Sequence, residues 1–367
     1  MRLVILQDYL RMGGTERQSL QIARDATRDG HVVTLLLFRP GGPLEGQLEG
    51  VPFGVEVLQQ YDTRVSLYAP RLIAAIERIR PEVILCMGRT ANCYAGFVQA
   101  RFPHRAVVGT LRTGKCLFPL QLWALAQVRG IIANSDWWRW RLRSWGVPVE
   151  GLAVIQNALL GGTAARCAEQ RKKKRAEAGL SAETVVLLKV AGFRAGKRHS
   201  GLLRLLAPLA HHSDLPPWEL WLVGDGRERR RCERLAARLG LNGHIRFLGA
   251  QTDPRPFYAA ADIAVSASTE DSLPNFLIEA QSMGLPLVAI DFRGVREACV
   301  PGYSGEVVGR RDGVGFAAAV ARLMRDETLR EEMGRHGREH AVRRFAPSTQ
   351  ARRMLDALVE MTAHEHI

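Results

Sequence analysis

The sequence of 367 residues lacks features that would assign it at once to a membrane or secreted class. It has no run of eighteen or more apolar residues, so no membrane-spanning helix is expected. The start shows no basic, apolar and small-residue order of a secretion signal, and an apolar strand is predicted directly at 3–6. We therefore expect a cytoplasmic protein, and the length allows two ordinary domains, each with its own core.

Patterns for disulfides and metal ligands are also missing. The six cysteines are scattered, with no Cys-x-x-Cys pair and no spacing typical of a metal site. Reduced thiols are the simplest expectation. No metal site is predicted.

Negative charge is scarce relative to positive charge. There are 51 Lys and Arg residues against 37 Asp and Glu residues, for a formal net charge of +14. Such a surface favours anionic partners, among them nucleotides, anionic lipid and nucleic acid. No helix-turn-helix, zinc finger or RNA-binding signature accompanies the charge, so nucleic acid is not expected as a partner. The alternative is a protein whose solvated faces simply use arginine.

Two series of alternating strand and helix patterns fill the chain. Near-continuous apolar strands separated by helices predict parallel sheets covered on both faces, and two such series predict two doubly wound α/β domains. The first series has strands at 3–6, 32–38, 55–58, 83–87, 106–111, 130–133 and 152–155. The second has strands at 184–190, 218–223, 245–248, 263–265, 287–290 and 306–308.

A polar and charged segment without a strand pattern, 161–183, separates the two series. Its RKKKR run, 171–175, is interpreted as a solvated linker or helix face rather than a nucleic-acid patch. Two helical segments end the chain, with a break at Pro347. The predicted domains are 1–165 and 166–345, followed by a C-terminal helix at 346–367.

Gly13 and Gly14 follow the first predicted strand and open the first helix. Glycines let backbone amides approach a ligand closely, and Thr15 can cap the helix. The motif is not the GxGxxG of a dinucleotide fold, so a hydride-transferring enzyme loses its main support. A purely structural turn is the alternative.

The segment 192–199 joins the first strand of the second series to its helix. Arg194, Lys197 and Arg198 place positive charges at the carboxyl end of a strand, where open α/β sheets bind ligands. Arg and Lys donate charge-assisted hydrogen bonds that a pyrophosphate needs. A second glycine turn that could approach the same ligand consists of Gly224, Asp225 and Gly226.

The stretch 263–284, IAVSASTEDSLPNFLIEAQSMG, combines an apolar strand, an acidic loop and a helix. The loop carries Glu270 and Asp271, and the helix is predicted to open at Pro274, which suits a first helical position. The open N–H groups of such a helix bind anions such as phosphate. Glu279, inside the helix, is placed to accept hydrogen bonds from ribose hydroxyls. The arrangement suits a sugar nucleotide, although a strand, loop and helix occur in every α/β protein.

Several ordered motifs carry a resemblance to a known family. Three blocks occur in order: VGDGRERRRCERLAARLGLNGHIRFLG, FYAAADIAVSAS and EDSLPNFLIEAQSMGLPLVA. Further blocks are GGTERQSLQIARDATRDGHVVTLL, ANSDWWRWRLRSWGV, VIQNAL and GYSGEVV. In these motifs the sequence resembles retaining GT-B glycosyltransferases of the group 1 (family 4) type. The resemblance covers essentially the whole chain and is tightest over 220–290.

The resemblance implies a GT-B fold, in which two Rossmann-like doubly wound domains face across a cleft. It implies that the C-terminal domain holds the nucleotide-sugar donor and the N-terminal domain binds the acceptor, with the last helix crossing back to the N-terminal domain. Members transfer a sugar with retained anomeric configuration and need no bound metal. No cofactor is therefore expected, and the nucleotide-sugar acts as a co-substrate.

Carried over by motif, Arg194 and Lys197 stabilise the departing diphosphate, Glu279 holds the ribose, and Asp271 lies near the transferred sugar. These four are the predicted catalytic residues. The predicted donor-binding residues are Gly13, Gly14, Arg198, Gly224, Asp225, Gly226, Glu270, Ser272, Leu273, Pro274, Asn275, Phe276 and Glu279. Backbone amides at Gly14, Asn275 and Phe276 are expected to complete the phosphate cradle.

The sequence departs from the family pattern at two places. Seven residues before Glu279 stands Asp271 where the E-x7-E motif has glutamate, and Glu270 lies one residue too far away. The family often has a histidine after the strand at 106–111, where this chain offers Arg112. Arg112 and Asn134 are weaker candidates for the acceptor or sugar side.

A tryptophan-rich, basic segment predicts a helix at about 135–145. Its membrane-facing candidates are Trp137, Trp138, Arg141 and Trp145. Such a helix can lie at an anionic lipid surface. The alternative is a helix packed on its own domain with its arginines facing water.

The predicted function is a retaining glycosyltransferase acting on a nucleotide-sugar, with a UDP-sugar as the first candidate. The predicted acceptor is a glycan or lipid-linked sugar in cell-surface polysaccharide or lipopolysaccharide biosynthesis, with the enzyme cytoplasmic or peripheral on the inner face of the membrane. A catalytically inactive scaffold or sugar-nucleotide-binding subunit is the alternative. An epimerase or phosphorylase has less support, because the motifs match transferases and no pyridoxal-bearing lysine is identified.

Overall fold

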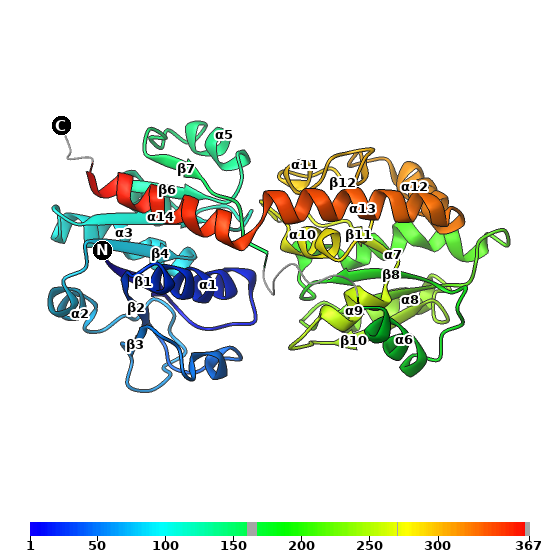
Figure 1. The fold of residues 1–367 in the computed structure, drawn as a ribbon, viewed down its shortest axis with the longest axis horizontal. Coiled ribbons are helices and arrows are strands. Elements are labelled where there is room, and N and C mark those ends of the chain that lie inside the picture. The colour runs from blue at the N-terminus through cyan, green and yellow to red at the C-terminus, as the bar shows by residue number, and fades with distance from the viewer. Residues whose placement is uncertain (160–166, 270, 364–367) are drawn as a thin grey trace. The chain divides into compact units, whose positions relative to one another are not determined.

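The computed structural model describes residues 1–159, 167–269 and 271–363. The chain forms two compact units (Figure 1). Unit 1 comprises Met1–Leu160 and Pro347–Ile367, and unit 2 comprises Gly161–Ala346. In the described residues no helix combines the length and apolar character needed to span a bilayer.

Unit 1 contains a parallel seven-stranded sheet in the order β3-β2-β1-β4-β5-β6-β7. Its strands are β1 (Arg2–Gln7), β2 (Val32–Leu37), β3 (Gly54–Val57), β4 (Val83–Met87), β5 (Ala106–Leu111), β6 (Gly130–Ala133) and β7 (Leu152–Val154). Successive residues of β1 point to opposite faces: Leu3 and Ile5 belong to one buried cluster, Val4 and Leu6 to another. Both faces are covered, which explains why residues 3–6 of the strand are all apolar.

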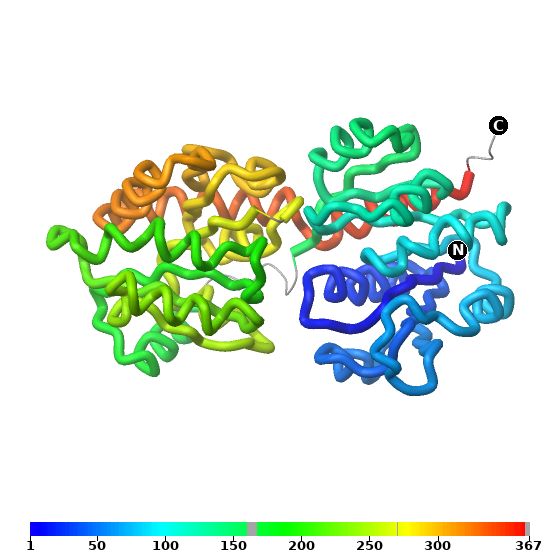
Figure 2. Tube along the Cα trace, turned by 180° about the vertical axis from the view of Figure 1, so that it is seen from behind, coloured from blue at the N-terminus to red at the C-terminus, as the bar shows by residue number. Residues whose placement is uncertain are grey.

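The helices of unit 1 cover these two faces. They are α1 (Gly14–Arg28), the short 3-10 helix η1 (Glu45–Leu48), α2 (Leu72–Ile79), α3 (Arg89–Arg101), α4 (Pro119–Ala126), α5 (Trp137–Arg143) and α14 (Pro347–Ala363). The chain's last helix, α14, places Met354, Leu358 and Met361 in the same buried cluster as Leu3 and Ile5. Both views show α14 in the unit that contains the N-terminal strand (Figures 1 and 2).

Unit 2 contains a parallel six-stranded sheet in the order β10-β9-β8-β11-β12-β13. Its strands are β8 (Val185–Val190), β9 (Trp218–Val223), β10 (Ile245–Gly249), β11 (Ile263–Ser266), β12 (Leu287–Ile290) and β13 (Gly305–Val308). Its helices are α6 (Ala168–Glu177), η2 (Ala195–Lys197), α7 (His199–Leu206), η3 (Ala207–His211), α8 (Arg229–Arg238), α9 (Arg255–Ala260), α10 (Asn275–Ser282), α11 (Val295–Ala298), α12 (Gly313–Arg325) and α13 (Glu327–Arg344).

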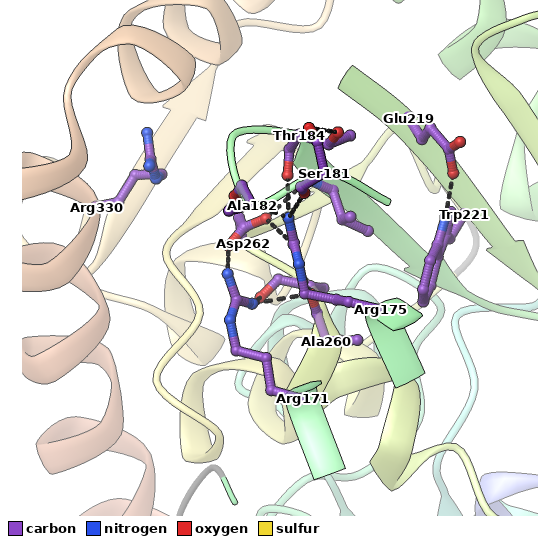
Figure 3. Close-up of polar contacts among 12 residues, drawn as sticks. Arg171, Arg175, Ser181, Ala182, Thr184, Glu219, Trp221, Ala260, Asp262 and Arg330 are labelled. Carbon is purple, nitrogen blue, oxygen red and sulfur yellow. Dashed lines mark hydrogen bonds and ion pairs between the residues drawn. The ribbon is translucent and has the colours of Figure 1, made fainter. Parts of the chain in front are cut away.

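The basic run at 171–175 is part of helix α6, and its first and last arginines are structural. Arg171 donates to Asp262 Oδ1 at 2.6 Å, and Arg175 donates to Asp262 Oδ2 at 3.1 Å (Figure 3). Asp262 also accepts a hydrogen bond from the backbone N–H of Val186 at 2.8 Å. The segment is therefore a helix, as the helix-face alternative expected, with Lys172 and Lys173 exposed, but its two arginines anchor it at the amino end of β11.

Two helix starts differ from the sequence prediction. Helix α1 has Gly13 at its N-cap and no side-chain cap, so Thr15 lies inside the helix and does not cap it. Helix α10 begins at Asn275, and Pro274 is its N-cap residue in an extended conformation. Pro274 thus ends the loop before the helix, where its fixed φ also suits the backbone.

Candidate active site

The strand order reverses direction at one place in each sheet, between β1 and β4 in unit 1 and between β8 and β11 in unit 2. In open α/β sheets, ligands bind outside the carboxyl ends of the strands at such a switch point. The candidate residues of each unit are therefore those that follow these four strands.

In unit 2 the cationic turn after β8 and the acidic loop after β11 lie together. Lys197 donates a hydrogen bond from Nζ to Asp271 Oδ1, forming an ion pair. The backbone N–H of Thr269 donates to the carbonyl of Gly196 at 2.9 Å. Ser268 Oγ donates to Asp271 Oδ2 at 2.6 Å, so both carboxylate oxygens of Asp271 are engaged. A cation and an acid far apart in sequence thus share the switch point.

The environment of Asp271 keeps its carboxylate ionised. Burial acts to raise the pKa of Asp271, but the charge and hydrogen bond of Lys197 and the hydrogen bond of Ser268 outweigh it. The net result is a pKa below the ordinary value. The carboxylate therefore remains a negative partner for Lys197 at neutral pH.

Lys189 lies at the candidate site and was not predicted from the sequence. It lies inside β8 with 1% of its surface exposed and donates to Ser266 Oγ at 3.3 Å. Its Nζ also lies 5.8 Å from the ring centroid of Phe276. Burial, and secondly repulsion from Lys197, lower the pKa of Lys189 to about 7. The signal in the sequence is a single lysine within the apolar strand VVLLKV.

His199, the first residue of α7, is also buried beside this site. Its ring stacks on Phe193, with centroids 4.0 Å apart. Burial, reinforced by the charges of Lys189 and Lys197, lowers the pKa of His199 to about 2. The imidazole is therefore neutral at physiological pH and contributes packing rather than charge.

Helix α10 supplies the predicted ribose ligand. Glu279 accepts a hydrogen bond from the hydroxyl of Tyr258 at 2.6 Å, and Tyr258 stacks on Phe276. This contact fixes the Glu279 carboxylate on one side of the helix. Tyr258 belongs to α9 and was not among the predicted residues.

The loop before α10 divides into buried and accessible residues. Ser272, Leu273 and Pro274 are buried, so their side chains pack inside the unit. Asn275 and Phe276 are partly exposed. Leu273 in particular is 3% exposed and does not offer its side chain to a ligand. Any part that these three buried residues play in binding has to come from their backbone. Glu270, the alternative acid, lies outside the described residues.

The glycines of the 224–226 turn are required by close packing of backbone on backbone. Gly224 has φ +141°, and a Cβ there would lie 2.1 Å from the carbonyl oxygen of Ala191. Gly226 has φ +149°, and its Cβ would lie 2.6 Å from the carbonyl oxygen of Phe193. The turn is thus held against the loop after β8, while Asp225 is exposed and accepts from the N–H of Gly226 at 2.6 Å. Ligand contacts by these three residues remain a prediction.

Two further arginines of the cationic turn face solvent. Arg194 is exposed, and its side chain makes no hydrogen bond or ion pair within the described part of the chain. Arg198 is exposed and adopts a left-handed backbone with φ 50°. A non-glycine residue in this region is uncommon and marks a constrained turn. Both side chains are available to an anion.

The switch point of unit 1 contains a polar cluster that the sequence analysis did not identify. Asp8 follows β1 and accepts from Arg11 at 2.8 Å and from the hydroxyl of Thr90 at 3.2 Å. Gly13 and Gly14 follow in the same loop, at the start of α1. A Cβ on Gly13 would lie 2.2 Å from the Glu16 carboxylate, so that side chain folds back over the helix start.

Arg112 and Asn134 come together at the carboxyl edge of unit 1. Arg112 donates to Asn157 Oδ1 at 2.7 Å, and Asn134 donates to the carbonyl of Arg112 at 3.3 Å. Burial lowers the pKa of Arg112 to about 10, which leaves it charged at neutral pH. Asn157, in the segment VIQNAL, completes this group although it was not predicted as a site residue.

The proposed membrane face of the tryptophan helix is contradicted by the packing of α5. Trp138 is fully buried in a core cluster, and Trp137 and Trp145 pack against the same cluster. Arg141 lies over the ring of Trp145, 4.1 Å from its centroid. The face that helical periodicity assigned to lipid is therefore the face turned to the protein core. Trp140, on the other side of α5, is 63% exposed.

A pocket of about 410 Å³ lies at the opposite, amino edge of the unit 2 sheet. It is lined in part by Arg171, Arg325 and Arg330. These arginines are already bound: Arg171 to Asp262, Arg325 to Asp214 at 2.5 Å, and Arg330 to the carbonyl of Leu323 at 2.7 Å. The pocket is distant from the switch point and its cations stabilise the fold. It is not the candidate site.

No group of three or more His, Cys, Asp or Glu residues that could hold a metal ion occurs in the described ranges. The absence of a metal requirement remains a prediction. The six cysteines are free thiols, and four of them are buried.

Two family models match the chain. The model of the glycosyl transferases group 1 matches residues 170–340, and the model of glycosyltransferase family 4 matches residues 12–159. The first matched segment lies in unit 2 and the second in unit 1.

Two relatives from Rhizobium meliloti (strain 1021) are similar in sequence. The chain is 34% identical to the lipopolysaccharide core biosynthesis glycosyltransferase LpsE over 172 residues, which are 47% of this chain and 49% of LpsE. It is 27% identical to the lipopolysaccharide core biosynthesis glycosyltransferase LpsD over 340 residues, which are 91% of each chain. The LpsE match thus spans about half the length of that protein.

Solved structures share the fold over nearly the full length. Anabaena Alr3699/HepE, in complex with UDP and glucose, superimposes with a TM-score of 0.84 at 22% identity, covering 98% of this chain and 99% of HepE. Sucrose-phosphate synthase from Thermosynechococcus elongatus gives a TM-score of 0.80 at 19% identity, covering 99% of each chain. The two parallel sheets and their helices form a GT-B fold.

Proposed function

Because the chain belongs to the group 1 glycosyltransferases of GT-B fold, we propose that it transfers a sugar from a nucleotide-sugar to a glycan or lipid-linked acceptor. The observation that carries this proposal is the Lys197–Asp271 pair at the switch point of unit 2. Beside it lie the exposed Arg194, the start of α10 and the fixed carboxylate of Glu279. These groups provide cations, helix amides and a carboxylate that can bind ribose, all at the carboxyl edge of one sheet.

In the proposed reaction the bond between the anomeric carbon and the diphosphate oxygen breaks. A bond from the acceptor oxygen to the same carbon forms on the same face, so the anomeric configuration is retained. The departing phosphate takes the proton of the acceptor hydroxyl. Lys197 and Arg194 stabilise the negative charge on the diphosphate, and the amides at the start of α10 add to this stabilisation. Because these cations belong to the protein, the scheme needs no metal.

The relatives support a donor and acceptor class. HepE is described in complex with UDP-glucose, and LpsE and LpsD are named for lipopolysaccharide core biosynthesis. We extend these properties to the present chain as proposals: a UDP-sugar donor, and an acceptor in cell-surface polysaccharide or lipopolysaccharide synthesis. A lipid-linked acceptor of this kind would place the proposed enzyme at the inner face of the membrane, on the cytoplasmic side.

An exposed aromatic surface of unit 1 supports the membrane part of the proposal. Phe97 on α3 and Trp123 on α4 are 54% and 43% exposed, and their rings touch with centroids 4.7 Å apart. Phe118 and Leu120, at the start of α4, are exposed as well. These four residues define the α3–α4 surface. Exposed apolar side chains gathered in one place are typical of a docking site.

The charge around the α3–α4 surface matches an anionic bilayer. Between Glu82 and Asp136 the sequence has no acidic residue and six Lys or Arg residues. Arg89 lies over the ring of Phe118, 4.4 Å from its centroid. Glu77 of α2, paired with Arg101 at 2.6 Å, is a nearby carboxylate. Aromatic and basic residues together favour the interface of an anionic membrane.

A donor panel tests the proposed reaction. The full chain is incubated with UDP-, GDP- and ADP-sugars, and both nucleotide binding and the slow release of nucleoside diphosphate are measured. Release from one class of donor, without added metal and in the presence of a chelator, is the expected result. Binding without release would instead favour the sugar-nucleotide-binding subunit, and no binding of any nucleotide would reject the proposal.

A further inference from the structure

Lys189 is an unusual residue for its position. Lysine is almost never fully buried unless it is paired, and Lys189 lies in the middle of the sheet of unit 2. Within the described part of the chain its ammonium makes one hydrogen bond, to the hydroxyl of Ser266. A hydroxyl does not neutralise the charge, so burial of this lysine lowers the stability of the fold.

Ser266 and Ser268 connect Lys189 to the candidate carboxylate, with the backbone and the hydroxyl of Ser268 each making one of the contacts. Ser266 Oγ accepts from Lys189 Nζ at 3.3 Å and from the backbone N–H of Ser268 at 3.4 Å. Ser268 Oγ in turn donates to Asp271 Oδ2 at 2.6 Å. Lys197 binds the other oxygen of Asp271. Asp271 is thus held between an outer cation, Lys197, and an inner one, Lys189.

The two cations have different freedom to move. Lys197 lies in the turn after β8 and is partly exposed, whereas Lys189 is enclosed by β11, the ring of Phe276 and the buried His199. In the proposed function, which this step presupposes, Lys197 turns to the diphosphate. Asp271 then loses its ion-pair partner, and a largely buried carboxylate without a counter-charge is costly. A second cation beneath it, together with the Ser268 hydroxyl, offsets part of that cost.

We propose that Lys189 is a positioning residue that keeps Asp271 ionised and in place, through Ser266 and Ser268, while Lys197 binds the leaving diphosphate. Lys189 does not touch the substrate. Its contribution is to the geometry and charge of the Asp271 carboxylate at the moment of transfer.

The groups that face Lys189 determine its protonation state. The charged groups are Lys197, which disfavours its protonation, and Asp271, which favours it. His199 is neutral, and Ser266 and Phe276 are uncharged. With a pKa of about 7, Lys189 is protonated below neutral pH and loses its charge above it. The binding of a dianionic diphosphate nearby raises that pKa and favours the charged form.

The test compares Lys189→Met with Lys172→Met, the same substitution at an exposed lysine of unit 2. Turnover, the KM for the donor and the thermal unfolding temperature are measured for both. For Lys189→Met we expect kcat to fall about tenfold or more, less than the ~10²–10³ loss typical of a direct contact. The donor KM should change little, and the unfolding temperature should stay or rise. Lys172→Met should match the wild type in all three.

Other outcomes would overturn the proposal. A kcat close to wild type would show that Lys189 does not support Asp271. A parallel loss of kcat and unfolding temperature, without partial rescue by Lys189→Arg, would show a purely structural role. If the wild type turns over no donor, it is the proposed reaction that fails. A double-mutant cycle of Lys189→Met and Asp271→Asn on the free energy of unfolding then still tests the link, and zero coupling contradicts it.

Discussion

Lys197 and Asp271 form an ion pair that joins the carboxyl ends of β8 and β11, although 74 positions separate the two residues in the chain. Each is also the residue that the family motifs assign to the donor. In the proposed function, a donor diphosphate competes with Asp271 for the same ammonium. On that proposal the pair is a resting contact that the substrate has to open.

Lys197→Ala should abolish most of the turnover. Removing one preorganised donor of charge-assisted hydrogen bonds costs about 10²–10³ in rate. The release of nucleoside diphosphate under saturating donor measures the effect, and Lys172→Ala serves as the control because Lys172 is exposed on α6. Activity within a factor of about two of wild type would remove Lys197 from the reaction.

Trp123→Ala should weaken binding to vesicles that contain phosphatidylglycerol, whereas Trp140→Ala should not. Both tryptophans are exposed on unit 1, but only Trp123 belongs to the α3–α4 surface. Co-sedimentation at low and high salt measures binding, which should fall as salt screens the charges. The reverse result, with Trp140 required and Trp123 dispensable, would place the contact on α5 instead.

Asp262→Ala should destabilise unit 2 strongly. Asp262 accepts from Arg171, Arg175 and the N–H of Val186, and removing one partner of a buried pair costs about 3–5 kcal/mol. Denaturant unfolding measures the loss. Asp253→Ala, which breaks the exposed pair with Arg255, is the matched control and should cost about 1 kcal/mol or less. Equal losses in the two variants would refute a structural role for the α6 anchor.

The stability of the wild type should increase with pH above neutrality relative to Lys189→Met. The pKa of Lys189 is about 7 in the folded protein, compared with an ordinary value of 10.5. Between pH 7 and 10.5 this lysine is therefore protonated in the unfolded chain but mostly neutral in the folded protein. The free energy of unfolding therefore rises as pH increases from about 7 towards 10.5. The variant has no such group and should lack this part of the slope. Thermal unfolding of both proteins from pH 6 to 10 measures the difference, and parallel curves would contradict it.

Gly224→Ala should lower the unfolding temperature, while Gly243→Ala should leave it nearly unchanged. At Gly224 the backbone has φ +141°, and the new Cβ would meet the carbonyl oxygen of Ala191 at 2.1 Å. At Gly243 nothing lies within 4 Å of the new Cβ. Substituting where φ is positive costs more than the roughly 0.4–1 kcal/mol that alanine gains elsewhere. A stable Gly224→Ala variant would show that this turn can shift.

Strand positions could be predicted closely because parallel strands covered on both faces are apolar at most of their residues. The predicted segment 83–87 coincides with β4 (Val83–Met87), and 218–223 coincides with β9 (Trp218–Val223). Helix α6 could not be identified with the same ease. Its polar anchor is two arginines on one carboxylate, and this kind of anchoring leaves no apolar period in the sequence.

The periodicity of α5 predicted the apolar face of the helix correctly but did not indicate what packs against that face. Trp137, Trp138 and Trp145 do share one side, and the structure turns that side to the core. Amphipathicity alone does not separate lipid from protein interior, because both are apolar. The exposed aromatic residues of α3 and α4 carry no comparable pattern and could be found only from their exposure.

Motifs in the sequence assigned some residues of the candidate site, and tertiary packing supplied others that the sequence did not reveal. Lys197, Asp271 and Glu279 stand in recognisable motifs. Lys189, Tyr258 and Asn157 acquire their places only when strands and helices are assembled, since each acts through a neighbour distant in sequence. Such neighbours cannot be predicted from the local sequence.

The assignment of α14 to unit 1 means that the polypeptide passes between the units twice, once near residue 160 and again near residue 346. A single protease cut in either passage would leave the two units still tethered by the other one. Deleting the last seventeen helical residues, by contrast, would strip apolar cover from the first unit and leave the second intact. A fusion tag at either end of the chain is therefore attached to the same unit.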